Sequence, residues 1–365
     1  MSVPFTEAEG PTMECGLIGL QGSGKTTLFQ ALTAHAVEVQ VGSMKPNLGI
    51  ADIPDPRLAR IATHIPTQKI VPANLQVVDI PGVPDGGGAA ALNAVLSSIR
   101  TVDAVCQVVR CWDDPGLGAA DPGSHIASLE TELVLADLVV AEGGVDKAKR
   151  AARSGDRDAK QRLEVLEKSH AMLGDEQPLR TGQWDESEAA LLKSYGMITA
   201  KPIMYVANVG EDGVAGESAA SIAVAEAAAA RGGVSVTLCA TIESEIAELD
   251  ESDRGEMLES MGIAEPALGA FARAANELLG LSTFYTAGEK EVRAWSIVQG
   301  ATAPEAAGAI HSDIQRGFIR AECYHVDELD EYKSEKAIKE AGKLRSEGKG
   351  YTMQDGDVVH YLFNV

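Results

Sequence analysis

The chain has 365 residues, of which 31 are basic and 54 are acidic, so its formal net charge is -23. Such an acidic chain is not a protein that coats nucleic acid, and its 45% hydrophobic content argues against a disordered chain. The length predicts two or three domains, because a single core rarely grows past about 250–300 residues.

The five cysteines are scattered, odd in number and without a C-x-x-C pair. This pattern fits neither a disulfide framework nor a zinc site, and it predicts buried, reduced thiols. The N-terminal stretch has acidic residues and no apolar core of a signal peptide. No run of about 18 apolar residues could span a membrane. We therefore expect a cytoplasmic protein without a membrane partner.

Short apolar strands alternate with helical stretches along much of the chain. The predicted strands are Cys15–Leu20, Leu75–Ile80, Ala104–Arg110, Pro202–Ala207 and Ser235–Ala240, and the predicted helices include Thr26–Ala36, Ala89–Arg100 and Ser218–Arg231. Nearly continuous apolar strands between helices are typical of a buried parallel sheet. The expected fold class is therefore α/β.

The segment Gly19-Leu-Gln-Gly-Ser-Gly-Lys-Thr26 fits the motif G-x-x-x-x-G-K-[ST] and lies between a predicted strand and a predicted helix. The glycines let backbone amides surround a polyphosphate, and the helix N-terminus adds positive potential. Lys25 is expected to reach the β- and γ-phosphates, and the Thr26 hydroxyl to bind Mg²⁺. The predicted nucleotide-contacting residues of this motif are Gly22, Ser23, Gly24, Lys25, Thr26 and Thr27.

Asp79-Ile-Pro-Gly82 follows the next predicted core strand and matches D-x-x-G. In P-loop proteins this Asp orients Mg²⁺ and the Gly amide contacts the γ-phosphate, so the predicted catalytic residues are Lys25, Asp79 and Gly82. Ser43 is a candidate third Mg²⁺ ligand beside Thr26 and Asp79, with a solvated loop serine as an equal alternative. Val83 replaces the water-orienting Gln, so slow turnover, suited to a switch, is expected.

Asn208-Val-Gly-Glu211 follows another predicted strand, at the place of the guanine-reading N-K-x-D motif. Asn208 is expected to brace the site, and Glu211 stands where an Asp would accept hydrogen bonds from guanine. The longer carboxylate leaves the choice between ATP and GTP open. Cys239 and Ala240 follow the next strand, and their backbone amides are expected to lie at the base.

Between residues 125 and 199 the apolar residues recur at alternating spacings of three and four. The seam Ile126, Leu129, Leu133, Ala136, Val140 and then Leu163, Leu166, His170, Leu173 predicts an antiparallel helical hairpin, interrupted by Gly143-Gly144 and Gly155.

The turn side of this hairpin, residues 147–162, has seven basic and two acidic side chains. It is a candidate contact for the phosphates of structured RNA or a ribosome, and an ordinary solvated helix face is the alternative. We do not expect a DNA partner.

From residue 282 the chain reads strand, turn, strand, turn, helix, and it ends in an alternating strand, which predicts a small α+β domain. The expected organisation is a nucleotide-binding domain of residues 1–124 and 200–281, an inserted helical arm of residues 125–199, and a C-terminal domain of residues 282–365.

Taken together, these residues resemble the YchF/Obg-like ATPase family, Obg-related P-loop GTPases with a C-terminal TGS domain. The most specific strings are Tyr205-Val-Ala-Asn208, Tyr285-Thr-Ala-Gly-Glu-Lys-Glu-Val-Arg-Ala-Trp295, Gly300-Ala-Thr-Ala-Pro-Glu-Ala-Ala-Gly308 and Gly317-Phe-Ile-Arg-Ala-Glu322. The resemblance implies a G domain, a coiled-coil arm and a β-grasp-like TGS domain. It also implies Mg²⁺-dependent hydrolysis of ATP, with GTP as a second substrate, and association with ribosomes.

The chain departs from the family pattern at three places and looks like a divergent member. Gly22 stands where the family has Asn, the first switch has Ser43 offset from the usual Thr, and the stretch after Gly82 is shorter. These departures leave open a nucleotide-binding scaffold with little turnover. A metabolic P-loop kinase is a further alternative, against which the TGS-like C-terminus argues.

Overall fold

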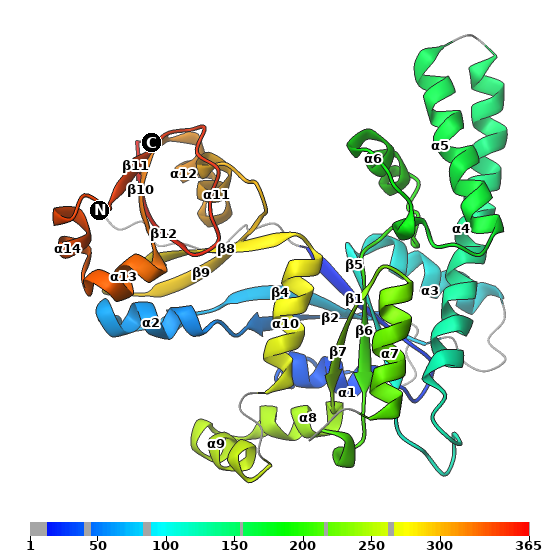
Figure 1. Cartoon of the computed structure of the whole chain (residues 1–365), viewed down its shortest axis with the longest axis horizontal. Coiled ribbons are helices and arrows are strands. Elements are labelled where there is room, and N and C mark those ends of the chain that lie inside the picture. The colour runs from blue at the N-terminus through cyan, green and yellow to red at the C-terminus, as the bar shows by residue number, and fades with distance from the viewer. Residues whose placement is uncertain are drawn as a thin grey trace. The chain divides into compact units, whose positions relative to one another are not determined.

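The computed structural model describes residues 13–39, 45–82, 89–153, 156–214, 218–261 and 266–364 (Figure 1). The chain divides into two compact units. The first unit contains residues 14–49 and 77–268, and the second contains residues 50–76 and 269–364. The described residues form two six-stranded sheets.

The first sheet is the parallel core that the sequence predicts. Its order is β2-β4-β1-β5-β6-β7, and β1, β5, β6 and β7 are parallel neighbours. The strands are β1 Glu14–Ile18, β2 Asn47–Ile53, β4 Ala73–Asp79, β5 Ala104–Arg110, β6 Ile203–Asn208 and β7 Val234–Leu238. Every residue of β5 and β6 is buried, as expected of central parallel strands covered on both faces.

Helices of the first unit complete its α/β core. They are α1 Lys25–Leu32, α3 Ala89–Thr101, α6 Glu186–Ser194, α7 Ala219–Ala230, α8 Ala240–Glu248 and α9 Glu251–Ser260, with the 3₁₀ helices η1 Leu179–Thr181 and η2 Glu211–Gly213. Apolar side chains of α3, α7 and α8, such as Ile99, Val224 and Ile246, join strand residues in one buried cluster. The carboxyl ends of the parallel strands lie at one edge of this core, where ligands of such sheets bind.

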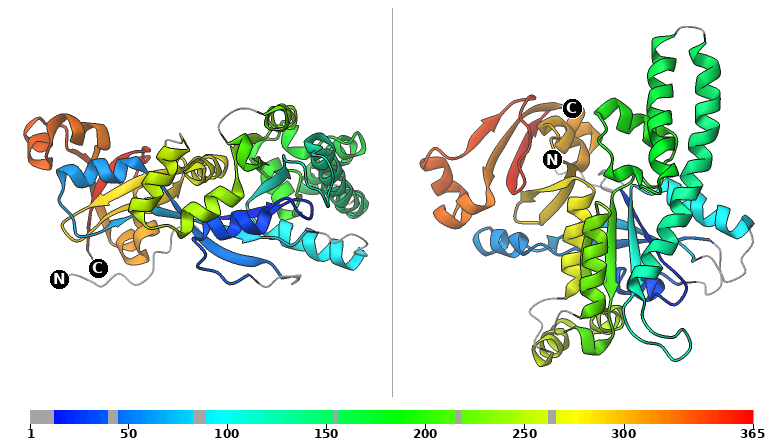
Figure 2. Two further views of the ribbon diagram at one scale, coloured as in Figure 1. Left: turned by 90° about the horizontal axis from the view of Figure 1, so that it is seen from below. Right: turned by 45° about the vertical axis from the view of Figure 1, so that its right-hand side comes forward.

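The predicted hairpin is formed by α4 Pro122–Ala152 and α5 Arg157–Gly174, which lie side by side in both views (Figures 1 and 2). The predicted interruption at Gly143-Gly144 is wrong, because α4 continues through both residues. A Cβ atom at Gly144 would lie 3.2 Å from both Leu166 and Tyr195 side-chain atoms. The glycine therefore allows a close approach between packed helices and does not end one.

The second sheet has the order β11-β10-β12-β8-β9-β3, with β12 parallel to β8 in its middle. Its unit contains α2 Pro56–His64, β3 Ile70–Val71, α10 Ala267–Leu278, β8 Leu281–Ala287, β9 Val292–Val298, α11 Ala303–Ile310, α12 Ser312–Arg316, β10 Phe318–His325, α13 Val326–Tyr332, α14 Glu335–Glu340, β11 Arg345–Glu347 and β12 Asp357–Phe363. Phe284, Trp295, Ala307 and Tyr361 form part of a core between α11 and the sheet. The predicted strand, turn, strand, turn, helix order and β-grasp-like architecture are confirmed.

Residues 50–76 belong to the second unit, although the sequence predicts no element before the strand that starts at Leu75. The short strand β3 pairs with β9, where Ile70 lies opposite Val292. Arg60 on α2 donates to Asp330 at 2.6 Å. In the sequence, α2 and β3 thus lie between β2 and β4. The residues that they contact belong to the C-terminal part of the chain.

All five cysteines are buried and free, as predicted. Over the residues that the structure describes, no helix has the length and apolarity needed to cross a membrane.

Candidate nucleotide-binding site

The loop between β1 and α1 has the shape of a phosphate-binding loop. Gly24 ends this loop in a left-handed conformation (φ +85°) and forms the N-terminal cap of α1. A Cβ atom at Gly24 would lie 2.2 Å from Asn208 Nδ2, and one at Gly19 would lie 2.4 Å from the Val108 carbonyl oxygen. Only glycine fits so close to a neighbouring strand. The loop leads directly into a helix N-terminus, an arrangement that suits a bound phosphate.

Lys25 is the first residue of α1, and 8% of its surface is exposed. Its Nζ donates to the Leu20 carbonyl oxygen at 3.2 Å, which holds the ammonium group at the loop. Burial lowers the pKa of Lys25, and the Asp79 carboxylate acts in the opposite direction. A Cβ atom at Gly82 would lie 3.2 Å from this Nζ. The glycine of D-x-x-G therefore adjoins the P-loop lysine, as a γ-phosphate site requires.

Thr26 and Asp79 place a hydroxyl group and a carboxylate side by side. Thr26 Oγ1 donates to Asp79 Oδ2 at 3.1 Å, and Asn47 Nδ2 donates to the same oxygen at 3.3 Å. The other carboxylate oxygen, Asp79 Oδ1, is buried without a hydrogen-bond partner among the described residues. A buried carboxylate beside a hydroxyl fits Mg²⁺, which takes few protein ligands and completes its shell with phosphate and water.

A complete protein-only metal site is not found in the described part of the chain, since no three His, Cys, Asp or Glu side chains gather there to hold an ion.

Asn208 joins the P-loop to the loop that follows β7. It is 2% exposed; its Nδ2 donates to the Ser23 carbonyl oxygen at 2.9 Å, and its Oδ1 accepts from the Ala240 amide at 2.9 Å. The predicted bracing geometry is therefore present. The Ala240 amide is thus already paired with the Asn208 side chain.

Glu211 and Cys239 lie near each other at the base end of the site. Glu211 is the first residue of η2 and is exposed, whereas Cys239 is buried and precedes α8. Burial raises the pKa of the Cys239 thiol; the amides of Thr241 and Ile242 oppose this effect, and the charge of Glu211 adds to it. The carboxylate therefore lies close enough to the loop after β7 for its charge to act on this thiol.

Trp112 is a site residue that the sequence reasoning missed. A Cβ atom at Gly24 would lie 3.7 Å from Trp112 Cη2, and one at Gly210 would lie 3.4 Å from Trp112 Cβ. The indole is thus placed between the P-loop and the segment that carries Glu211. Its signal in the sequence was an aromatic residue just beyond the carboxyl end of a central parallel strand.

Arg110 holds the loop that follows β5. Its guanidinium group donates to the carbonyl oxygens of Trp112 at 2.6 Å and Gly118 at 2.9 Å, and to those of Leu117 and Ala119 at 3.2 Å. Four bonds from one buried side chain fix the path of this loop. Arg110 therefore determines where Trp112 lies.

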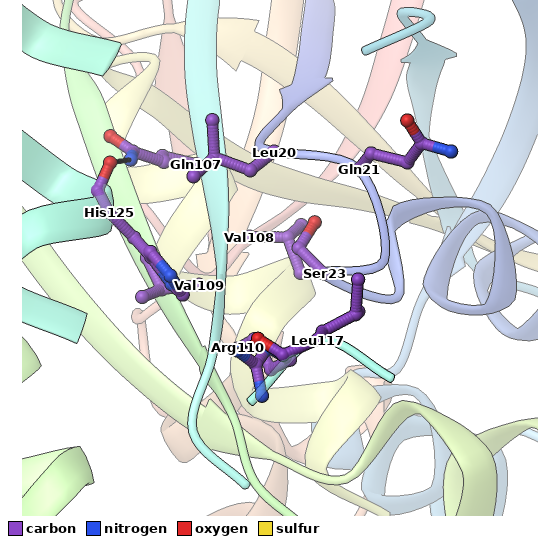
Figure 3. Close-up of a pocket in the computed structure, with 9 residues that line it drawn as sticks. All are labelled: Leu20, Gln21, Ser23, Gln107, Val108, Val109, Arg110, Leu117 and His125. Carbon is purple, nitrogen blue, oxygen red and sulfur yellow. Dashed lines mark hydrogen bonds between the residues drawn. The ribbon is translucent and has the colours of Figure 1, made fainter. Parts of the chain in front are cut away.

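A cavity of about 110 Å³ lies beside the P-loop (Figure 3). Ser23, Gln107, Leu117 and His125 are among the residues that line it, and Gln107 Nε2 donates to the His125 carbonyl oxygen at 3.4 Å. Ser23 Oγ and Gln107 Oε1 are buried without a partner among the described residues. The lining does not include Lys25, Thr26 or Asp79, so this cavity is separate from the phosphate side and has room for a few water molecules.

The predicted site residues gather at the carboxyl edge of the first sheet. Asp79 and Asn208 are the last residues of β4 and β6. The segments that follow β1, β4, β6 and β7 carry the others, which are Gly22, Ser23, Gly24, Lys25, Thr26, Thr27, Gly82, Glu211, Cys239 and Ala240. Ser43 and Val83 lie outside the described residues.

The chain is similar to known proteins over nearly its whole length. The family profile MMR_HSR1, described as "50S ribosome-binding GTPase", matches residues 14–142, and the profile YchF-GTPase_C, described as "Protein of unknown function (DUF933)", matches residues 281–364. The protein named Ribosome-binding ATPase YchF of Pasteurella multocida is 43% identical over 361 residues, which cover 96% of this chain and 99% of the relative. The protein of the same name from Bacillus subtilis is 41% identical over 364 residues, which cover 97% and 100%.

A solved structure extends this likeness to the whole fold. The structure of the Schizosaccharomyces pombe YchF GTPase matches with a TM-score of 0.85 and 28% identity, covering 99% of this chain and 100% of that one.

Proposed function

Because this chain belongs to the YchF family of Obg-related P-loop NTPases, we propose that it is a switch ATPase that hydrolyses ATP with Mg²⁺ and associates with ribosomes. The observation that carries this proposal is the Thr26–Asp79 pair beside Lys25, at the end of a phosphate-binding loop. GTP is a second substrate in this proposal, since Glu211 leaves a carboxylate near the base.

The chemistry follows from the residues around the P-loop. Backbone amides of the loop and the Lys25 ammonium group bind the β- and γ-phosphates and stabilise charge that develops as the β–γ bond breaks. Thr26 and Asp79 hold Mg²⁺, which when bound neutralises phosphate charge. Val83, after Gly82, has no polar side chain to orient the attacking water. Intrinsic turnover is therefore slow, as in a switch.

The base end favours stacking over selective hydrogen bonding. In this proposal the indole of Trp112, which lies beside Gly24, stacks on the base, and stacking tolerates either purine because both have a π-face. Asn208 holds the loops, while Glu211 and the backbone near Cys239 line the edge of the base. ATP is proposed as the main substrate because the relatives are named ATPases.

Ribosome association is proposed from the names of the relatives and from the charge of the arm. All seven basic side chains of residues 147–162 are exposed, and Lys149 forms an ion pair with Glu167 at 3.3 Å. A basic helical tip suits contact with RNA phosphates in the cytoplasm. In this proposal, the arm of residues 125–199 and a TGS domain of residues 282–365 dock to the ribosome, and residues 1–124 and 200–281 bind nucleotide.

Phosphate release from ATP and from GTP, with and without ribosomes, tests the activity. We expect slow release that ribosomes change, and we expect Lys25→Ala to lose nucleotide binding. Binding without any release would favour the scaffold. Unchanged nucleotide affinity in Lys25→Ala would reject the site.

Charge reversal of the arm tests the proposed contact. The triple change Arg150→Glu, Arg153→Glu and Arg157→Glu should reduce co-sedimentation with ribosomes and lower its dependence on salt. Nucleotide affinity should not change, because these side chains are exposed on the arm. Undiminished co-sedimentation would exclude the arm as the contact.

A further inference from the structure

Two buried carboxylates on α4 fasten the arm to the rest of the first unit. Glu130 and Asp137 are 6% and 0% exposed. They lie on one face of the helix, because their spacing corresponds to about two turns. Acidic side chains are seldom fully buried unless they are paired. Both carboxylates belong to hydrogen-bonded networks that reach beyond the arm.

Asp137 accepts four hydrogen bonds. Its Oδ1 accepts from the Ile198 amide at 3.0 Å and from Arg100 NH1 at 3.2 Å, and its Oδ2 accepts from the Thr199 amide at 2.7 Å and the Thr199 hydroxyl at 2.9 Å. Arg100 also donates to the Ala136 carbonyl oxygen at 3.3 Å. The C-terminal turn of α3 is thereby fixed to the arm.

Glu130 forms the second network. Both of its oxygens accept from Arg180 NH2 at 2.6 Å, and Oε2 also accepts from the Tyr205 hydroxyl at 3.1 Å. Arg180 Nε donates to the Arg231 carbonyl oxygen at 2.9 Å, so the ion pair also includes the end of α7. The strand β6 is thereby fixed to the arm through Tyr205.

Each network ends on an element that is linked to the nucleotide site. α3 is the next element along the chain after Asp79-Ile-Pro-Gly82, and β6 carries Asn208, which bonds the P-loop. We propose that Glu130 and Asp137 are positioning residues that couple the orientation of the arm to the nucleotide state of the site. This inference rests on the proposed nucleotide binding.

Such networks do not deform gradually. A buried carboxylate that loses a donor is left with an unpaired charge, so each network has discrete arrangements. If a γ-phosphate at Gly82 shifts α3, the Arg100–Asp137 contact must move the arm or break. The coupling is reciprocal, so a partner bound to the arm changes nucleotide affinity by the same factor that nucleotide changes affinity for the partner.

Pulsed EPR on the full chain tests this coupling. Spin labels at Asp146→Cys on α4 and Glu226→Cys on α7 report the arm's position, and both sites are exposed whereas the native cysteines are buried. We expect the distance between the labels to change between ADP and a non-hydrolysable ATP analogue, each with Mg²⁺. Asp137→Asn should lose this change in distance. Its Kd for ADP should change by less than roughly fivefold, which is the low end of typical coupling factors.

Two further variants serve as a control and as a second test. Glu132→Gln, an exposed carboxylate on the same helix, should retain the full distance change. Arg100→Lys is a second test variant, which can replace Asp137→Asn if that protein does not fold. It should also lose the change in distance between the labels. An unaltered distance change in the folded Asp137 or Arg100 variant would overturn the proposal. The proposal would also be overturned if calorimetry shows that wild type binds nucleotide but the distance between the labels does not change. Failure of wild type to bind nucleotide would instead reject the proposed function, and the coupling with it.

Discussion

At the scale of single residues, Lys25 makes nucleotide binding depend on pH. Burial lowers its pKa in the free protein, whereas bound phosphates raise it. Between these two pKa values binding takes up a proton, so affinity falls as pH rises through the lowered pKa. We expect the calorimetric Kd for ADP to increase toward alkaline pH, with a limiting slope of about tenfold per pH unit. Lys25→Arg keeps its charge and should give a flatter profile; equal slopes would contradict this assignment.

The residues of the site differ in how far the sequence could predict them. Lys25, Thr26 and Asp79 belong to motifs whose spacing is fixed by the strand and helix around them, so their place could be predicted. Asn47 could not, since its contact with Asp79 joins positions 32 residues apart and depends on the pairing of strands. Trp112 could be suspected only as an aromatic residue at a strand end.

At the scale of elements, the two neighbouring glycines of α4 lie in opposite environments. A Cβ atom at Gly143 would meet nothing within 4 Å, whereas one at Gly144 would lie 3.2 Å from Leu166 and Tyr195. Gly143→Ala should therefore stabilise the protein by about 0.5–1 kcal/mol, because alanine loses less backbone entropy in a helix. In thermal unfolding, Gly144→Ala should gain less stability than Gly143→Ala, or should lose stability. A larger gain at residue 144 would mean that the helices are not closely packed there.

Strand β5 and helix α4 show how far the elements could be predicted from the sequence. β5 has the predicted bounds, since its apolar residues and flanking breaks leave little choice. In α4 the glycine pair predicts a break because helix interiors disfavour glycine, but packing against Leu166 overrides that preference. Glu130 and Asp137 were left out of the predicted seam, since an apolar pattern does not detect buried carboxylates that have distant donors.

At the scale of the whole molecule, the assignment of residues 50–76 depends on contacts that no local pattern reveals. Arg57 donates to Asp355 at 2.5 Å, and Tyr285 donates to Asp55 at 2.5 Å. Burial acts to raise the pKa of Asp55, but hydrogen bonds from Arg57 and Tyr285 outweigh it and lower this pKa. Asp355 is 298 positions from Arg57 and Tyr285 is 230 positions from Asp55, so the predicted domain boundary at residue 282 could not take these contacts into account.

Removal of residues 282–365 tests this organisation. Leu58 and Ile61 of α2 are buried, and loss of their surroundings should cost about 1.5–3 kcal/mol for each side chain. β3 would also lose its pairing with β9. We expect hydrogen exchange in residues 56–71 to become fast in the truncated chain. Helices α4 and α5, whose buried cluster lies within the first unit, serve as the internal control and should stay protected. Full protection of residues 56–71 after truncation would mean that this segment is stabilised by the first unit and does not need the C-terminal part of the chain.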